Sequence, residues 1–426
     1  MIPNLIAIPD GMSTKAFVFA RGALNDLPTV LREMFHGRRP WIVSDENTRR
    51  AAGDRAMEIL ENAGLRPYPQ HVLPGTPKPH PLVSLSEKLA GLMPDDAIPL
   101  AVGSGVINDL VKVASGIRNV PYVCVPTAAS VDGYTSAGGA MVKDGYKKTV
   151  PCPPPTAIVA DLDVLESAPA EMLAGGYGDL YSKVTAGGEW LIADALGIEP
   201  IEPKVWALVQ HPLRRNLSDS KNVEFVFHGL AATGYSMQMY HDSRPASGSE
   251  HLCSHIWEME GHTFHGDSVS HGFMVSVATL AIIRIMNFVI GHTAEEARRM
   301  AKPGLSRAER EREIDRILVR GCYGTAGDTA REKILAGAEL EARRELILKN
   351  WELIGERLKK QLYAPDEAER MLKDAGAPTH YSEIGLPHEQ FIHGIHAAQL
   401  IRKRYTVLDM LYEAGLLDEA VMTSGI

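Results

Sequence analysis

The chain has 426 residues, a length that at about 100–200 residues per domain predicts two or three domains with sizeable cores. Hydrophobic residues make up 45% and charged residues 23% of the chain, and these proportions exclude extended disorder. The 44 Lys and Arg against 53 Asp and Glu give a formal net charge of −9, so neither a nucleic acid nor an anionic membrane is expected as a partner. An anionic small molecule would have to be held by a few locally placed donors.

The four cysteines are widely spaced and form no Cys-x-x-Cys pair, which favours a reduced, cytoplasmic setting over a disulfide framework. The first residues show no basic segment followed by an apolar core, so no secretory signal is expected. The longest apolar run, Phe273–Ile290, contains Arg284 and Asn287 and falls short of the roughly 18 apolar residues that a membrane span needs. We therefore expect a soluble protein without a membrane span.

The first 160 or so residues alternate short β-branched runs with amphipathic segments. The predicted strands are Ala16–Phe19, Trp41–Ser44, His71–Leu73, Ile98–Val102 and Tyr122–Val125. The predicted helices between them are Leu24–Met34, Thr48–Gly64, Leu82–Leu92 and Val106–Ile117. Strands that alternate with helices of this length predict a parallel, Rossmann-like sheet covered on both faces.

A change in pattern follows this region. Ala140–Lys143 and Thr156–Ala160 are predicted to form an added hairpin, with Asp144-Gly145 as a turn signal between them. After Asp161, long amphipathic helical patterns dominate the sequence. We therefore predict an α/β dinucleotide-binding domain over residues 1–162 and an all-helical domain, which binds metal and substrate, over residues 163–426.

A glycine-rich loop follows one predicted strand and opens a helix. It reads Gly103-Ser104-Gly105-Val106-Ile107-Asn108-Asp109, and position 108 is Asn where the G-x-G-x-x-G pattern has its third Gly. Glycines let the backbone approach an anion closely, and a helix N-terminus offers free N–H groups to phosphate. On glycine spacing alone, a phosphate-binding loop and a plain strand-to-helix turn explain the motif equally. Asp45, at the end of the second strand, suits the adenosine ribose of a dinucleotide, and a surface turn explains it about as well.

Six histidines lie between His241 and His271. His251 and His255 are four residues apart and share a face on a helix, and His265 follows ten residues later, past a turn. Imidazoles are common ligands of Zn²⁺, Ni²⁺ and Fe²⁺, and a catalytic site needs about three protein ligands and an open position. The pair with a third histidine favours a metal site over chance clustering. Asp179 is the candidate carboxylate, and a helix N-cap is the other reading of that residue.

These motifs, in the order in which they follow one another along the chain, resemble those of the superfamily of dehydroquinate synthases and iron-containing alcohol and glycerol dehydrogenases. Within it, the chain closely resembles the sn-glycerol-1-phosphate dehydrogenases. The segments that carry the resemblance are Val102–Lys112 (VGSGVINDLVK), Val125–Ser136 (VPTAASVDGYTS), Gly176–Asp179 (GYGD), Ser243–His255 (SRPASGSEHLCSH), Phe264–Gly266 (FHG) and Arg404–Asp409 (RYTVLD). They run from about residue 40 to about residue 415. The resemblance implies a dehydroquinate synthase-like fold and a homo-oligomer, a dimer or larger.

The resemblance also implies roles for these residues. A divalent metal, zinc as a rule and nickel in bacterial members, would be held by Asp179, His251 and His265. The pyrophosphate of NAD or NADP would lie on Gly103–Ile107, with Asp109 in the same motif, and His255 would lie beside the substrate and the cofactor as a proton carrier. The residues that would line the nicotinamide and substrate edge are Thr127, Ala128, Asp132 and Ser136. The implied reaction is the reversible reduction of dihydroxyacetone phosphate to sn-glycerol 1-phosphate.

The substrate phosphate needs a ligand that the acidic chain as a whole does not provide. Arg244 stands where dehydroquinate synthases present a substrate-binding arginine, and a guanidinium fork suits a phosphate dianion. Lys147 and Lys148 are further candidates, equally explained as solvated charges of the hairpin.

The sequence also departs from the family pattern. The usual His-Gly-Glu-Lys-Val reads HGDSV from His265, with His271 as an additional imidazole, and Ala140 replaces a lysine of the synthases, which argues against synthase activity. The alternatives are a dehydrogenase of another polyol or sugar phosphate, or a non-catalytic nucleotide-binding homologue.

Overall fold

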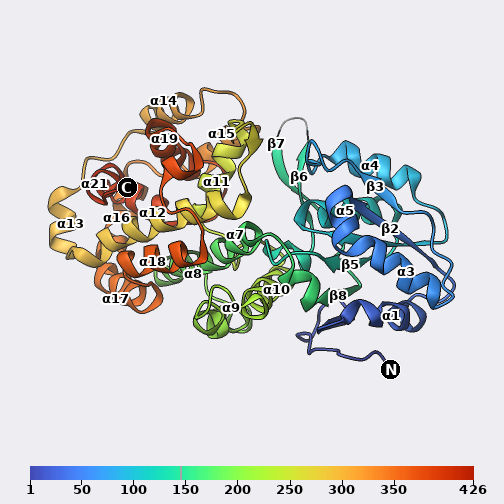
Figure 1. The fold of residues 1–426 in the computed structure, drawn as a ribbon. Helices are drawn as coiled ribbons and strands as arrows, with labels where there is room; N and C mark the ends of the chain where they lie inside the picture. Colours follow the sequence, from blue (N-terminus) through green and yellow to red (C-terminus); the bar gives the residue numbers. More distant parts are fainter. Residues whose placement is uncertain (144–145) are drawn as a thin grey trace. The chain divides into compact units, whose positions relative to one another are not determined.

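The computed structural model describes residues 1–143 and 146–426 and divides them into two compact units. Unit 1 consists of Met1–Gly176 and Arg214–Asp242, and unit 2 of Tyr177–Leu213 and Ser243–Ile426. The predicted boundary after residue 162 lies inside unit 1, and a further segment of that unit follows much later in the chain. Figure 1 labels the elements, which are taken below one unit at a time.

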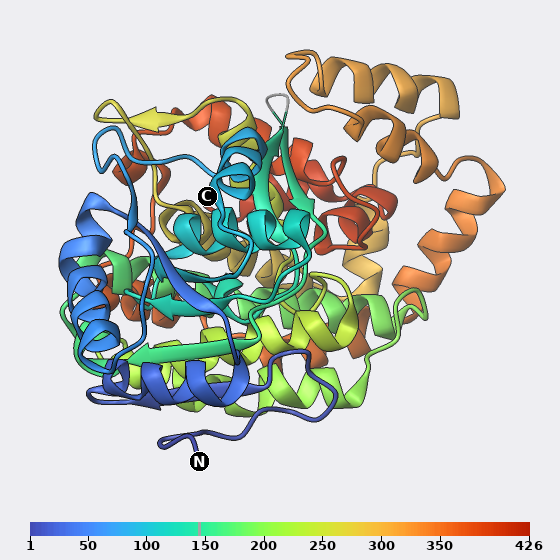
Figure 2. The ribbon, with the colours of Figure 1, turned by 90° about the vertical axis from the view of Figure 1, so that its right-hand side faces the viewer.

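A six-stranded parallel sheet forms the centre of unit 1 (Figure 2). Its order is β1-β8-β5-β4-β2-β3, and every neighbouring pair is parallel. The strands are β1 (Ala16–Ala20), β2 (Arg39–Asp45), β3 (His71–Leu73), β4 (Ala97–Gly103), β5 (Val123–Pro126) and β8 (Ala157–Asp161). The remaining elements of unit 1 are η1 (Ala23–Asp26), α1 (Leu27–Met34), α2 (Glu46–Thr48), η2 (Arg49–Gly53), α3 (Asp54–Asn62), α4 (Val83–Leu92), α5 (Gly105–Arg118), η3 (Asp132–Tyr134), β6 (Gly139–Lys143), β7 (Tyr146–Val150), α6 (Leu162–Glu166) and α10 (Val223–Tyr240). The predicted parallel sheet is confirmed.

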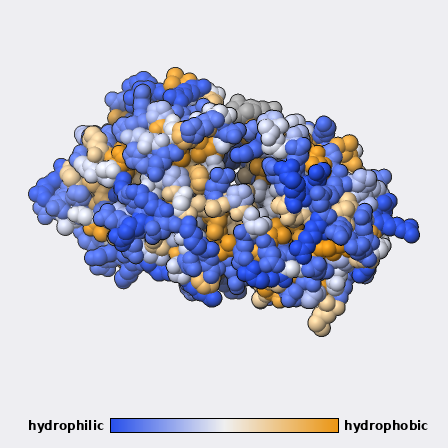
Figure 3. Space-filling model, viewed as in Figure 1, coloured by the Kyte–Doolittle hydropathy of each residue, from blue (hydrophilic) through white to orange (hydrophobic). Residues whose placement is uncertain are grey.

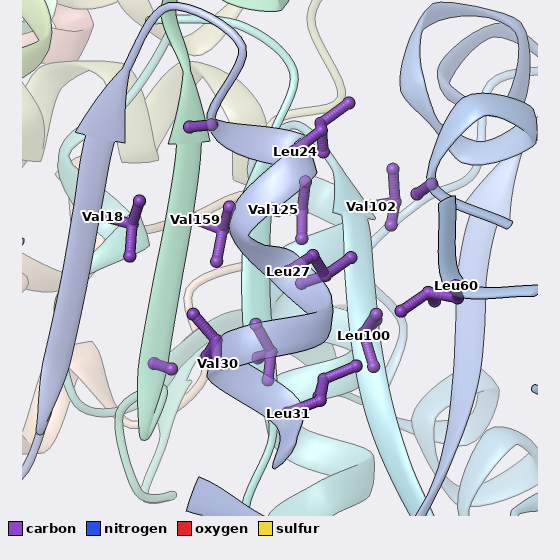
Figure 4. Packing of buried hydrophobic residues seen from close by; sticks show 14 of the residues in the cluster. Val18, Leu24, Leu27, Val30, Leu31, Leu60, Leu100, Val102, Val125 and Val159 are labelled. Atoms are coloured by element: carbon purple, nitrogen blue, oxygen red, sulfur yellow. The ribbon is translucent and has the colours of Figure 1, made fainter. Parts of the chain in front are cut away.

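Both faces of this sheet are covered, as its β-branched strands require. On one face, Leu27, Val30 and Leu31 of α1 point toward valines and leucines of the strands, and Leu60 of α3 lies in the same cluster (Figure 4). On the other face, Phe227 of α10 contacts the strand residues Phe17 and Phe19, with ring centroids 6.1 and 5.4 Å apart. Carboxyl ends of parallel strands meet at one edge, so β4 delivers its glycine loop to that edge.

The predicted hairpin is wrong in its second strand. Residues 157–160 of this predicted strand fall on β8, which lies between β1 and β5 in the main sheet. The first predicted strand instead pairs with β7, from Gly139 opposite Val150 to Lys143 opposite Tyr146. The turn signal Asp144-Gly145 lies outside the described residues. A buried β-branched run near a turn has the same sequence pattern in a hairpin and in a central strand, so the pattern could not tell the two apart. Only the strand pairing in the folded chain distinguishes them.

Unit 2 is helical, as predicted, apart from a small hairpin. Its elements are the end of α7 (Ala170–Tyr181), α8 (Lys183–Ala195), most of α9 (Pro203–Asn216), α11 (Ser249–Met259), β9 (Thr263–Phe264), β10 (Asp267–Ser268), α12 (His271–Gly291), α13 (Ala294–Met300), α14 (Arg307–Ile317), α15 (Ala326–Glu332), α16 (Ala338–Lys349), α17 (Trp351–Gln361), α18 (Pro365–Ala375), η4 (Tyr381–Ile384), α19 (His388–Ala398), α20 (Val407–Glu413) and α21 (Leu417–Thr423).

Helix α12 is the central helix of unit 2. Its 21 residues, with a mean hydropathy of 2.1 over the most apolar window, are long and apolar enough to cross a membrane, but 78% of that window is buried. It packs against α11, α17 and α18, which is the behaviour of a core helix. The surface in Figure 3 is mostly hydrophilic, with small scattered hydrophobic areas, as is usual for a folded chain in water.

Candidate active site

Three residues of unit 2 form a group of potential metal ligands: Asp179 on α7, His251 on α11 and His271 at the start of α12. One ligand atom from each lies within 4.8 Å of the others. The chain brings α7 and α12 together through Gly178, where a Cβ atom would lie 2.7 Å from the carbonyl oxygen of Gly272. Any larger residue at position 178 would push apart the two helices that carry Asp179 and His271.

Asp179 is fully buried and paired with a cation. Its Oδ1 accepts a hydrogen bond from Lys183 Nζ at 2.7 Å and lies 3.4 Å from His251 Nε2. Burial opposes ionisation of Asp179, but the charge of Lys183 and the hydrogen bond from His251 outweigh it and lower the pKa of this carboxyl. Asp179 is therefore an ionised carboxylate, the form that binds a metal.

Each histidine of the group also faces a glutamate. His251 Nδ1 lies 3.1 Å from Glu250 Oε1, and His271 Nδ1 lies 3.4 Å from Glu258 Oε1. Burial and the charge of Lys183 oppose protonation of His251, but the hydrogen bonds to Asp179 and Glu250 prevail and raise the pKa of His251. Two imidazoles and a carboxylate in this spacing fit a divalent zinc, nickel or iron ion.

The structure does not bring His265, the predicted third ligand, to this group. His265 is exposed on the turn between β9 and β10, where its φ is 53°, and its ring lies on Phe264 with centroids 3.9 Å apart. The residue that joins Asp179 and His251 is His271, which sequence reasoning set aside as an additional imidazole. The signal that could have found it is its position as the first residue of a long apolar helix, a rigid element that holds a ligand in place.

His255 lies beside the ligand group. Its ring centroid is 6.4 Å from that of His251 and 6.2 Å from that of His271, with which it is nearly parallel. Its side chain is half-buried. Three imidazoles are therefore gathered at this place in unit 2.

The guanidinium of Arg244, the predicted phosphate ligand, is already bound by other groups of the protein. Only 2% of its side chain is exposed, and its two terminal nitrogens donate to the carbonyl oxygens of Tyr405 and Glu189, each at 2.9 Å. Its Nε forms an ion pair with Glu199 at 2.9 Å. The guanidinium thus fixes the loop before α11 and does not face a solvent-accessible substrate, which corrects the role predicted from the sequence.

The glycine loop of unit 1 joins β4 to α5. A Cβ atom on Gly103 would lie 2.6 Å from Ile107 Cβ, and one on Gly105 would lie 2.9 Å from Val131 Cγ2. Ser104 is the N-cap residue of α5, and its side chain caps no backbone group. Ser104, Gly105 and Val106 are half-buried. The 14-residue helix therefore begins without a side-chain cap on its first backbone N–H groups.

A buried lysine organises the neighbouring loop of unit 1. Lys112 Nζ donates to the carbonyl oxygens of Gly133 and Gly138 at 2.9 and 3.0 Å and to Ser136 Oγ at 3.4 Å. It also pairs with Asp109 at 3.3 Å. Burial raises the pKa of Asp109, and the charge of Lys112 opposes this. The quoted motif contained Lys112, but sequence reasoning gave it no role.

The other predicted cofactor residues of unit 1 follow the strand ends. Asp45 caps α2, because its Oδ1 accepts from the backbone N–H groups of Asn47 and Thr48, both at 2.8 Å. The backbone N–H of Thr127 donates to Gly103 O at 3.2 Å.

Three more predicted residues lie near this region of unit 1. The carbonyl oxygen of Ala128 accepts from the hydroxyl of Tyr134 at 2.6 Å. Asp132 begins η3, two residues before that tyrosine. Lys147 lies half-buried on β7, and its charge favours ionisation of Asp109.

Comparison with a family profile and with solved structures shows which known proteins share this fold. The profile of the family described as iron-containing alcohol dehydrogenase matches residues 18–169. The fold is similar to that of an iron-containing alcohol dehydrogenase from Corynebacterium glutamicum, with a TM-score of 0.61, 14% identity, and 98% of this chain and 97% of that chain covered. It is also similar to a probable glycerol dehydrogenase from Sinorhizobium meliloti, with a TM-score of 0.59, 17% identity, and 96% and 97% covered. The chain thus shares the fold of the iron-containing alcohol and glycerol dehydrogenases.

More similar sequences narrow the class to a family. A glycerol-1-phosphate dehydrogenase from Halalkalibacterium halodurans is 33% identical over 277 residues, which cover 62% of this chain and 68% of that protein. One from Bacillus licheniformis is 28% identical over 401 residues, which cover 92% and 87%. The chain belongs to the glycerol-1-phosphate dehydrogenase family, and the family predicted from the sequence motifs is confirmed.

Proposed function

We propose that this chain reversibly reduces dihydroxyacetone phosphate to sn-glycerol 1-phosphate with NADH or NADPH and a divalent metal, zinc or nickel. The observation that carries the proposal is the buried group Asp179, His251 and His271, with ligand atoms within 4.8 Å, in a chain of the glycerol-1-phosphate dehydrogenase family. The four free cysteines support a cytoplasmic location.

Asp179, His251 and His271 would hold the metal. When bound, the metal would polarise the ketone oxygen of the substrate. The protein contributes an ionised carboxylate, Asp179, and two imidazoles, each of which has one ring nitrogen beside a glutamate. A metal in this group would have only nitrogen and oxygen ligands from these three residues, which suits zinc and nickel.

His255 would deliver the proton. Reduction of a ketone needs a proton at the oxygen as hydride arrives at the carbon. Imidazole titrates near neutral pH and can supply that proton directly or through one water molecule. The half-buried ring of His255, 6.2 Å from that of His271, supports this role.

The glycine loop would hold the cofactor. The pyrophosphate of NAD(P) would accept hydrogen bonds from the N–H groups of Gly103–Ile107 at the start of α5. Asp45 would face the adenosine ribose, and its negative charge would disfavour the 2′-phosphate of NADP. The loop that Lys112 organises includes Ser136, which supports a place for Asp132 and Ser136 along the nicotinamide and substrate edge.

The phosphate of the substrate would need a ligand other than Arg244. Lys147, on β7, is the remaining candidate that sequence reasoning named. The occupied guanidinium of Arg244 also favours a second candidate function: a dehydrogenase that acts on another polyol or sugar phosphate with the same scaffold.

A steady-state assay with dihydroxyacetone phosphate tests the proposal. The metal-depleted protein is assayed with NADH and with NADPH, each with and without added Zn²⁺ or Ni²⁺. We expect oxidation of the reduced cofactor that depends on both dihydroxyacetone phosphate and metal. Robust turnover of unphosphorylated dihydroxyacetone would contradict the phosphate assignment and favour the second candidate. No turnover and no stoichiometric metal would favour a non-catalytic homologue.

A further inference from the structure

We propose that Glu250 and Glu258 position the two histidines of the ligand group, Glu250 by accepting the Nδ1–H of His251 and Glu258 through its ion pair with the imidazole of His271. His251 would then present its Nε2 atom, unprotonated, to a metal, and the ring of His271 would be held in place beside it. This inference rests on the proposed function, because it needs a metal at Asp179, His251 and His271. It assigns the two glutamates as positioning residues that act through the ligands.

The contacts of His251 support the role proposed for Glu250. Its two ring nitrogens face different acids: Nδ1 lies 3.1 Å from Glu250 Oε1, and Nε2 lies 3.4 Å from Asp179 Oδ1. Neutral imidazole has one donor and one acceptor nitrogen, and the acceptor is the one that binds metal. A carboxylate at Nδ1 holds the proton there, so Nε2 remains available on the side of Asp179.

Glu250 is itself fixed by the chain around it. Its side chain is fully buried, Oε1 also accepts from the backbone N–H of Gly248 at 2.5 Å, and Oε2 accepts from Thr185 Oγ1 at 2.9 Å. Both carboxylate oxygens are therefore engaged. A carboxylate that cannot rotate fixes the ring plane of the histidine it contacts.

The contacts of His271 support the role proposed for Glu258. Its Nδ1 lies at an ion-pair distance of 3.4 Å from Glu258 Oε1, without a hydrogen bond, and its ring centroid is 5.3 Å from that of His251. On α11, His251, His255 and Glu258 lie at spacings of four and three residues and thus share one face. One helix face therefore supplies a ligand, the proposed proton carrier and the acid that orients the other ligand.

Two carboxylate–histidine pairs around one group are unlike an accidental contact. A partner at the second ring nitrogen fixes the tautomer and raises the basicity of the ligand, and its removal lowers metal affinity about 10–100-fold. Glu258 is 20% exposed, so its substitution leaves the core largely intact. Glu250 is buried, so its substitution tests the larger effect at a greater risk to folding.

The experiment measures the affinity of the metal-free full chain for Zn²⁺, by competition with a chelator of known affinity, without substrate or cofactor. The variants are Glu258→Leu, Glu258→Gln and Glu250→Gln. The control is Glu260→Leu, because Glu260 just after α11 pairs with His393 at 3.0 Å, and neither residue belongs to the ligand group. Thermal unfolding of each metal-free variant separates loss of affinity from loss of fold.

We expect Glu258→Leu to weaken Zn²⁺ binding about 10–100-fold. Glu250→Gln should weaken it less, since an amide oxygen still accepts the Nδ1–H of His251, and Glu258→Gln should weaken it less than Glu258→Leu, since it keeps a polar group beside His271. Glu260→Leu should leave it unchanged. Equal affinities for wild type, Glu258→Leu and Glu260→Leu would overturn the positioning role and leave the metal assignment standing. An equal loss in Glu258→Leu and Glu260→Leu would also overturn it, as a general structural effect. If the wild-type chain binds neither Zn²⁺ nor Ni²⁺, the proposed function falls as well.

Discussion

The glycine loop of unit 1 presents backbone groups, whereas the histidine group of unit 2 presents side chains that come from three helices. In unit 1, Gly103 and Gly105 allow close backbone packing, and one lysine, Lys112, ties the neighbouring loop through carbonyl oxygens. In unit 2, every proposed ligand has a charged partner of its own, such as Lys183 for Asp179. A contiguous motif can therefore encode the first site, but only the tertiary structure assembles the second.

The difference teaches where each site is vulnerable. A site made of backbone groups tolerates changes of side-chain chemistry. It is disrupted when a larger residue replaces one of its glycines, or when the side chain that holds the loop in place is removed. A side-chain site tolerates neither loss of a ligand nor loss of the partner that orients it. Four predictions use this contrast, in order of expected effect.

Substitution of His271 by Ala should have the largest effect. It removes a ligand from the proposed metal site, and a metal supplies several kcal/mol of transition-state stabilisation, so kcat/KM should fall about a thousandfold. Substitution of His265 by Ala is the matched control, because that residue is exposed on the β9–β10 turn and lies outside the group.

Bound metal and kcat/KM of both variants check this prediction. The His265→Ala variant should retain stoichiometric metal and change kcat/KM by less than about threefold. The opposite pattern, with metal lost in His265→Ala and kept in His271→Ala, would restore the ligand set expected from the sequence.

Substitution of Lys112 by Met should destabilise unit 1. Methionine has a similar volume but leaves Asp109 and the carbonyl oxygens of Gly133 and Gly138 without their shared donor. Removal of one partner from a buried ionic network costs about 3–5 kcal/mol. The urea midpoint of unfolding measures this loss, and the KM for the cofactor should rise with it. A loss of less than about 1 kcal/mol would mean that the loop holds its shape without the lysine.

The sequence predicted the parallel sheet and the glycine loop because strand, turn and helix signals there are local. It did not separate His265 from His271, because each is followed by glycine and they lie only six residues apart. Only the start of α12, packed on Gly178, decides which imidazole reaches Asp179. Likewise, a motif cannot tell whether Arg244 faces a substrate or the carbonyl oxygens that surround it here.

Substitution of Gly103 by Ala tests the backbone site by added volume. The new Cβ would lie 2.6 Å from Ile107 Cβ, so α5 has to shift, at a cost of about 1–3 kcal/mol in stability. The N–H groups of α5 shift with it, and the KM for NADH should rise about tenfold, which corresponds to about 1.4 kcal/mol. Gly91→Ala in α4 is the control, because no atom lies within 4 Å of its added Cβ. That variant should gain about 0.5–1 kcal/mol in stability and keep the same KM; an unchanged KM in Gly103→Ala as well would argue against a cofactor role for the loop.

The last prediction concerns a carboxyl that supports unit 2 without belonging to the ligand group. Burial and the charge of Glu250 raise the pKa of Glu189 to about 8, far above its usual range. Between pH 5 and pH 8 the folded chain therefore keeps a proton that the unfolded chain releases, so this group lowers stability as pH rises through that window. Glu189→Gln has no proton to release, so its stability should fall less between pH 5 and pH 8 than that of the wild type. Thermal unfolding of both proteins at pH 5, 6, 7 and 8 measures the slope. Equal slopes would mean that Glu189 is ionised in the folded chain, and that its hydrogen bonds from Ser249 and Val407 hold a charge that the buried site accommodates.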